Sequence, residues 1–194
     1  LALDVTGPKA LHFRDWRVYL HPSTLNAIIA YSMARISNVE SANRVLDPMC
    51  GSGTILIETG LAYERPMLYG MDINARHIEG ALSNIRKAGL EKRCFLKVGN
   101  ALSIKDYFDL SFDRIMTNPP YGIREAYYCS SLYELYEGFM SSALEVLTGD
   151  GLITILTPRR RIMKKVIRKF KLKIVRRKDI EHGGIRTTLF VLSG

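Results

Sequence analysis

Short apolar stretches alternate with longer amphipathic ones along most of the chain. Five short stretches, each bounded by polar residues or glycine, span 44–47, 68–72, 94–98, 113–117 and 152–156. Strands of a parallel sheet that are buried on both faces have this near-continuous apolar character. The pattern therefore predicts a parallel sheet with helices between its strands.

The stretches between these strands have the spacing of amphipathic helices. Ile78, Ala81, Leu82 and Ile85 form one apolar stripe, which we expect Gly89 to end. A longer stripe, which we expect to end at Gly149, consists of Leu132, Leu135, Tyr136, Phe139, Met140, Ala143, Leu144 and Leu147. A further amphipathic helix is predicted over 22–36, ahead of the first strand.

The C-terminal part follows a different pattern. Thr157 can cap a helix that starts at Pro158, because proline at the first helical position loses no hydrogen bond. The inward face of this helix would consist of Ile162, Met163, Val166, Ile167 and Phe170. The stretches 171–176 and 187–192 then flank a Gly183-Gly184 turn, which favours antiparallel pairing. The predicted fold is α/β and Rossmann-like, with a mostly parallel seven-stranded sheet and an antiparallel C-terminal hairpin.

The composition of the chain favours a globular protein over a membrane, zinc-binding or disulfide-rich one. The chain has 194 residues, 47% hydrophobic and 24% charged, which suits one globular domain. No apolar run approaches the ~18 residues of a membrane span, so we expect no membrane association. Cys50, Cys94 and Cys129 are too few and too far apart for a zinc cluster or a disulfide framework. We therefore expect no metal site and a reducing, cytoplasmic location.

The net charge of +9 is concentrated in one block. Residues 159–178 hold 12 Lys and Arg and no acid, so the rest has 28 − 12 = 16 basic against 19 acidic residues. Such a block is typical of a phosphate-binding surface. Its helical part gives the RNA-binding candidates Arg159, Arg160, Arg161, Lys164, Lys165 and Arg168. The alternative is a solvated helix face followed by an edge strand protected by lysines.

A glycine turn follows the first predicted strand, in the segment Asp47-Pro48-Met49-Cys50-Gly51-Ser52-Gly53-Thr54. In a doubly wound sheet this turn lies in the ligand-binding crevice, and the helix N-terminus after it favours a carboxylate or phosphate. A dinucleotide site would need a third glycine at Leu56, and a P-loop would need Gly-Lys-Ser/Thr. The acid four residues before the first glycine instead suits the ammonium group of S-adenosylmethionine.

Polar residues also follow the next two strands. Asp72, with Ile73 after it, ends the second strand at the distance where an acid accepts ribose hydroxyls. Asn100, followed by Ala101, comes after the third strand and could meet the adenine amine. Either polar residue alone could be only a helix cap, but the set at successive strand ends indicates a nucleoside site.

The segment Asn118-Pro119-Pro120-Tyr121 follows the fourth strand. Two consecutive prolines cannot bond within a central strand, so Asn118 must lie just past the strand end. There its side-chain oxygen and the Pro119 carbonyl can both accept hydrogen bonds from one planar amino group. Tyr121 can stack on the ring that carries the amine. The alternative is a proline-rich turn that merely ends a strand.

With these residues in view, the chain resembles the class I S-adenosylmethionine-dependent RNA methyltransferases often found behind a THUMP RNA-binding domain. It is most similar to those that make N2-methylguanosine in tRNA. Besides the glycine turn and Asn-Pro-Pro-Tyr, the resemblance rests on Phe13-Arg14-Asp15-Trp16-Arg17, His21-Pro22-Ser23-Thr24-Leu25 and His182-Gly183-Gly184. It implies that Ser23 or Thr24 encloses the methionine part of the cofactor. Asn100 replaces the family's usual Asp, and its carbonyl oxygen can still accept the adenine amine.

This resemblance implies an N-terminal segment, residues 1–38, packed on a catalytic domain of residues 39–194. The chain does not begin with Met, and we expect a fragment of a longer, monomeric protein whose THUMP-like domain lies elsewhere. Three other functions stay open: an adenine-amine DNA or rRNA methyltransferase, a glutamine methyltransferase of release factors, and a non-catalytic RNA-binding subunit.

Overall fold

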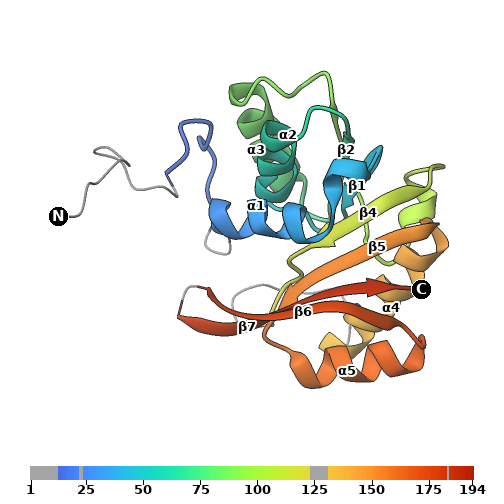
Figure 1. Ribbon diagram of the computed structural model, residues 1–194. Coiled ribbons are helices and arrows are strands. Elements are labelled where there is room, and N and C mark those ends of the chain that lie inside the picture. The colour runs from blue at the N-terminus through green and yellow to red at the C-terminus, as the bar shows by residue number, and fades with distance from the viewer. Residues whose placement is uncertain (1–12, 22–23, 123–130, 183) are drawn as a thin grey trace.

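The computed structural model of the chain describes residues 13–21, 24–122, 131–182 and 184–194 (Figure 1). The helices in these ranges are α1 (Ala27–Ile36), α2 (Thr54–Ala62), α3 (Ala75–Lys87), α4 (Leu132–Glu145) and α5 (Arg160–Lys169). The strands are β1 (Arg44–Asp47), β2 (Met67–Asp72), β3 (Cys94–Val98), β4 (Phe112–Thr117), β5 (Leu147–Thr157), β6 (Lys173–His182) and β7 (Ile185–Ser193). No helix within the described ranges is long and apolar enough to span a bilayer.

All strands join one seven-stranded sheet in the order β3-β2-β1-β4-β5-β7-β6. The strands β1 to β5 pair in parallel, and β7 pairs antiparallel with both β5 and β6. The predicted α/β fold, with its parallel sheet and antiparallel C-terminal hairpin, is thus confirmed.

Helices cover both faces of the sheet, with α1, α2 and α3 on one side and α4 and α5 on the other (Figure 1). On the first side Met33, Ile57 and Ile85 pack over β1 and β2 in one buried cluster. On the second side a buried cluster includes Phe139 and Val166. Burial on both faces explains why the parallel strands are apolar throughout.

The strand order reverses between β1 and β4. These strands are parallel neighbours, with Leu46 opposite Ile115, so they end side by side at the same edge of the sheet. Ligands of doubly wound folds bind at such a switch point, outside the carboxyl ends of the strands. The architecture therefore selects the loops after β1 and β4 as the place for a functional site.

Two predicted helix boundaries were wrong. The helix predicted over 22–36 begins at Ala27, because the Asn26 side chain accepts the amide of Ile28 at 2.9 Å and caps it. The helix predicted to end at Gly149 stops at Glu145. Leu147 leaves its apolar stripe and pairs with Phe112 in the sheet, so Gly149 lies within β5.

Two further details of the predicted helices were wrong. The last helix begins at Arg160, and Thr157 accepts the amide of Arg159 instead of capping a helix that starts at Pro158. On α3, Leu82 is 39% exposed, whereas the neighbouring Asn84 is fully buried. Asn84 occupies the inward position because the N-terminal segment, described below, bonds to its side chain.

Candidate active site

The glycine turn links β1 to α2 at the switch point. Gly51 and Gly53 have φ angles of +52° and +80°, in the left-handed region that favours glycine. The Cys50 amide donates to the Met71 carbonyl at 2.9 Å, which ties the turn to β2. A side chain at Gly51 would also collide with His21, whose Nε2 would be 2.7 Å from the added Cβ. The glycines therefore allow a tight turn into α2 that leaves room for the His21 ring.

Asp72, at the end of β2, joins this turn to α3. Its Oδ2 accepts the Gly51 amide at 2.9 Å, and its Oδ1 accepts the Asn74 amide at 2.9 Å. His77 Nδ1 lies 3.2 Å from the same Oδ1. Asp72, the residue predicted to bind the ribose, thus also stabilises the glycine turn.

Asp47 is buried directly behind the turn and is only 1% exposed. Its Oδ1 accepts the Met49 amide at 3.2 Å. Burial is the main cause that raises the pKa of Asp47 to about 7, and the nearby Asp72 carboxylate adds to the shift. The Thr117 hydroxyl of β4 lies close enough to offset part of it, although it makes no well-formed hydrogen bond within the described part of the chain. A cation placed here would favour the charged carboxylate.

The loop after β3 meets the same edge of the sheet. The Gly99 amide donates to the Asp72 carbonyl at 2.9 Å, and Asn100 Oδ1 accepts the Leu102 amide at 3.0 Å. Ala101 is buried beside it, whereas Ile73, next to Asp72, is 45% exposed. Because a carbonyl oxygen has two lone pairs, Asn100 can still accept from an adenine amine.

The N-terminal segment is held against the turn by Asn84 of α3. Its Oδ1 accepts the amides of Val18 and Tyr19 at 2.9 and 2.8 Å. Its Nδ2 donates to the carbonyls of Tyr19 and Ser52, both at 3.0 Å. All the hydrogen-bonding capacity of this buried amide is therefore used to join the segment, α3 and the glycine turn.

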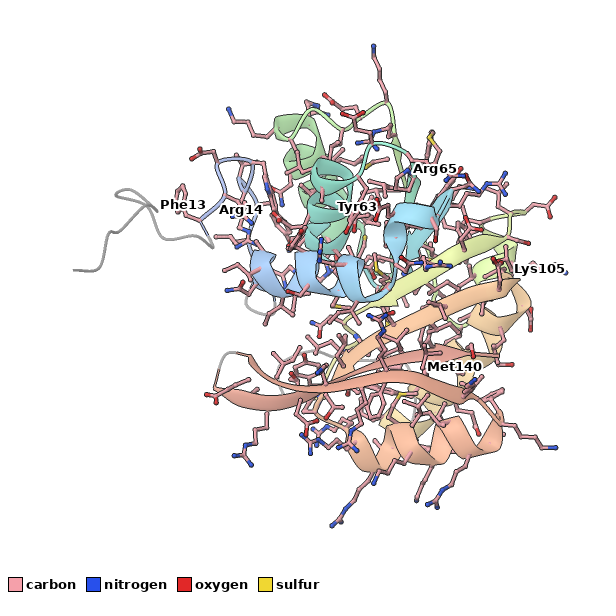
Figure 2. All side chains as sticks on the ribbon, in the orientation of Figure 1. Phe13, Arg14, Tyr63, Arg65, Lys105 and Met140 are labelled. Atoms are coloured by element: carbon pink, nitrogen blue, oxygen red, sulfur yellow. The ribbon has the colours of Figure 1, made fainter. Side chains whose placement is uncertain are left out.

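Two further contacts fix the same segment. The His21 ring stacks on His77, with centroids 4.7 Å apart and planes 14° apart. Arg14, labelled in Figure 2, donates from Nε to the buried Glu58 of α2 at 2.6 Å. Of the two predicted methionine-side ligands, Ser23 lies outside the described residues, and Thr24 Oγ1 accepts the His21 amide at 3.1 Å.

The predicted base-binding turn follows β4. Asn118 and Pro120 are partly exposed and Pro119 is buried. The Tyr121 hydroxyl donates to Asn118 Oδ1 at 2.6 Å, so one acceptor position of this oxygen is occupied. The parallel pairing of β1 with β4 puts this turn beside Asp47 and the glycine turn, as the predicted site requires.

The basic block divides into parts with different surroundings. Arg161, Lys164, Lys165 and Arg168 are exposed, and Figure 2 shows nitrogen-tipped side chains projecting from the outer face of α5. Arg160 pairs with Asp179 at 3.0 Å. Arg159 is partly buried, and its guanidinium donates to the Tyr121 carbonyl. The strand half of the block is β6, which lies at the edge of the sheet, where lysines discourage pairing with other chains.

Sequence reasoning missed Asn84, His77 and the partner of Arg159. A signal existed for Asn84, since a polar residue interrupts the apolar side of α3. The contact between Arg159 and Tyr121 joins segments 38 positions apart, and no local pattern indicates it.

Comparisons with known proteins agree with this geometry. Residues 14–188 match the RMKL-like, methyltransferase domain. The chain belongs to this family. It is 32% identical to the tRNA (guanine(6)-N2)-methyltransferase of Archaeoglobus fulgidus over 216 residues, which cover 98% of this chain and 54% of the relative.

Two solved structures have the same fold. TrmN from Thermus thermophilus superimposes with a TM-score of 0.78 at 28% identity, covering 87% of this chain and 49% of TrmN. SMU.472, solved in complex with SAH, superimposes with a TM-score of 0.74 at 21% identity, covering 93% of this chain and 55% of SMU.472. The family member described here thus spans about half the length of the proteins that it matches.

The buried Asp47 carboxyl predicts a pH dependence of stability. Its pKa rises from an ordinary 3.8 to about 7 on folding, so the folded chain keeps a proton that the unfolded chain loses between these values. The free energy of unfolding should therefore fall as pH rises through this window, by up to about 1.4 kcal/mol per pH unit from this group, and level off above it. Asp47→Asn removes the titration. In urea denaturation, the free energy of unfolding of Asp47→Asn should therefore rise relative to that of the wild type as pH increases to about 7. A difference between the two proteins that does not change with pH would contradict the assignment.

The Asn84 amide predicts a loss of stability on truncation. Asn84→Ala leaves two amides and two carbonyls without their partner, and we expect a loss of roughly 2–4 kcal/mol. Ser83→Ala, which removes only a bond to the Glu79 carbonyl, is the matched control and should cost far less. Equal free energies of unfolding for the two variants would show that Asn84 does not hold the N-terminal segment.

Proposed function

We propose that this chain is the catalytic domain of an S-adenosylmethionine-dependent methyltransferase that modifies the exocyclic N2 amine of guanine in tRNA. The observation that carries the proposal is the side-by-side ending of β1 and β4. One strand leads into the glycine turn and the other into Asn118, so a methyl donor and an acceptor amine held there would meet. The relative from Archaeoglobus fulgidus supports guanine N2 in tRNA as the target.

The ends of the first three strands fit this cofactor. The buried Asp47 suits its ammonium group, the N-terminus of α2 after Gly53 suits its carboxylate, and Asp72 suits the ribose. The exposed Ile73 and the Asn100-Ala101 loop suit the adenine. When bound, S-adenosylmethionine supplies an electrophilic methyl group on a positively charged sulfur. The SAH complex of SMU.472, which has the same fold, is consistent with this choice.

The turn after β4 fits the acceptor. An exocyclic amine is a weak nucleophile because its lone pair is conjugated with the ring. Asn118 Oδ1 and the Pro119 carbonyl can accept hydrogen bonds from its two N–H groups, favour a tetrahedral nitrogen and stabilise the positive charge that develops on it. The nitrogen would take the methyl group as the bond from that group to sulfur breaks, and one N–H proton would then leave to solvent. The Tyr121 hydroxyl occupies one acceptor position of Asn118 Oδ1 at 2.6 Å, and the second lone pair is left for the amine. The guanine must be flipped out or presented from a loop, where Tyr121 can stack on it.

The activity of the whole protein is part of the same proposal. The chain spans about half the length of its relatives, and we place a THUMP-like RNA-binding domain in the remainder. We propose a monomer in the cytoplasm, where the buried free thiols of Cys50 and Cys94 would stay reduced. The exposed face of α5 would contact tRNA phosphates.

Mass spectrometry of nucleosides tests the function. Full-length protein, unmodified tRNA and methyl-labelled S-adenosylmethionine should give labelled N2-methylguanosine after digestion. Label on an adenine amine, in RNA or in duplex DNA, would establish the adenine alternative. In parallel incubations, label in a release-factor glutamine would establish the glutamine alternative, and tRNA binding without cofactor binding would establish the non-catalytic subunit. A tRNA in which guanine 6 is replaced tests whether the target position matches that of the relative.

The Asn118 side chain should affect turnover rather than cofactor binding. Asn118→Ala removes one of the two acceptors and should lower the single-turnover rate roughly 10²-fold. Asn118→Asp, which keeps an oxygen acceptor, should retain more activity. Calorimetry should give nearly unchanged cofactor affinity for both variants. A wild-type rate in Asn118→Ala would exclude the acceptor-pair mechanism.

The outer face of α5 should supply the salt dependence of tRNA binding. Arg161, Lys164 and Arg168 are exposed at helical spacing. Changing all three to Gln should reduce the slope of log affinity against log salt by about 0.7–0.9 per lost phosphate contact. The melting temperature and cofactor affinity should change little.

The matched control for this variant lies on the edge strand. Changing Lys173, Arg176 and Lys178 of β6 to Gln removes the same charge from residues that are also exposed. It should alter the slope much less. If both triple variants leave the slope unchanged, the solvated-surface alternative is correct for the whole block.

A further inference from the structure

The Arg159 guanidinium binds within the protein. Its Nε and one Nη donate to the Tyr121 carbonyl oxygen at 2.9 and 2.6 Å, and the residue is only partly exposed. Two donors from one planar fork fix both the direction and the distance of this carbonyl, and bonds from a charged donor are stronger than neutral ones. This geometry differs from that of Arg161, two residues later, whose side chain is exposed.

Arg159 is itself anchored to the core. Its amide donates to Thr157 Oγ1 at 3.0 Å, and this hydroxyl lies 2.7 Å from the Tyr136 hydroxyl of α4. Thr157 and Tyr136 are both buried. Burial also raises the pKa of Tyr136 to about 12, so the phenol stays neutral. The hydrogen bonds thus continue from α4 through the end of β5 to Arg159.

Both ends of Tyr121 are held. Its carbonyl accepts from Arg159, and its hydroxyl donates to Asn118 Oδ1 at 2.6 Å. The guanidinium therefore acts on the same short turn that carries the acceptor oxygens of the proposed reaction. Displacing such groups by about 1 Å can cost a factor of 10² in rate.

We propose that Arg159 is a positioning residue that fixes the Asn118–Tyr121 turn for methyl transfer, and that it does not serve as a phosphate contact. This inference rests on the proposed function, because it assigns a role within the same site. The interaction that Arg159 makes depends on its forked shape, whereas a phosphate contact would depend mainly on its charge.

Arg159→Lys separates these two roles, because it keeps the charge and loses the fork. We expect kcat to fall about tenfold or more, while tRNA affinity and its salt dependence stay near wild type. Arg86→Lys, an exposed arginine at the end of α3, is the matched control and should leave all three unchanged. Cofactor affinity and melting temperature report on folding. Wild-type kcat in Arg159→Lys, or a loss confined to tRNA affinity, would overturn the proposal.

Hydrogen exchange provides a readout that does not need activity. In Arg159→Lys and Arg159→Gln, the amides of Tyr121 and Gly122 should exchange faster, whereas those of α1 should not; Pro119 and Pro120 carry no amide hydrogen. Unchanged exchange of these two amides would overturn the proposal even if the wild type is active. If the wild type transfers no methyl group, the proposed function fails, and faster exchange would still establish that Arg159 holds the turn.

Discussion

The parallel pairing of β1 with β4 is the constraint on which the site depends. These strands are distant in sequence, and their pairing brings the loops after Asp47 and Thr117 to one edge of the sheet. Each loop alone has an ordinary structural explanation, since one is a glycine turn and the other a proline turn that ends a strand. Only their adjacency makes transfer between a cofactor and an amine possible.

A network of hydrogen bonds holds these loops in place. Asp72 joins the glycine turn to α3, and Asn84 joins α3 to the N-terminal segment. On the other side of the switch point, Arg159 joins the turn after β4 to the end of β5. Asp47, at the end of β1, lies between these two sets of hydrogen bonds, and burial raises the pKa of its carboxyl. Burial of this acid without a full set of partners is a local cost that a bound cation would offset.

The sequence was sufficient for the fold class because apolar runs and glycine turns are local signals. The bounds of β1 and β3 agree with those predicted, and those of β2, β4 and β7 lie within two residues of them. The other two predictions were wrong at one end, since β5 begins five residues earlier and β6 ends six residues later than predicted. The errors occurred where long-range contacts override local pattern. Leu147 continues the apolar spacing of α4 but pairs with Phe112 in the sheet. On α3, Leu82 is exposed, and Asn84 faces inward, where its side chain bonds to the N-terminal segment. Thr157 looks like a helix cap, yet its hydroxyl bonds Tyr136 and the Arg159 amide.

The candidate site was predictable to a similar extent. The positions of Asp47, Asp72, Asn100 and Asn118 at the strand ends could be predicted because each polar residue follows an apolar run. Arg159 was grouped with the surface arginines, since charge in a sequence does not reveal whether a guanidinium meets a carbonyl or solvent. Its contact with Tyr121 depends on β4 and β5 being neighbours in the sheet, and the apolar pattern does not reveal which strands are neighbours.

A co-crystal structure with S-adenosylhomocysteine tests the central claim most directly, because that claim is spatial. The account predicts the ligand along the carboxyl ends of β1, β2 and β3, with its amino acid end at Asp47 and Gly51–Gly53 and its ribose at Asp72. Its sulfur should face the turn that carries Asn118. A ligand bound elsewhere, or one whose sulfur points away from Asn118, would contradict the shared site at the switch point.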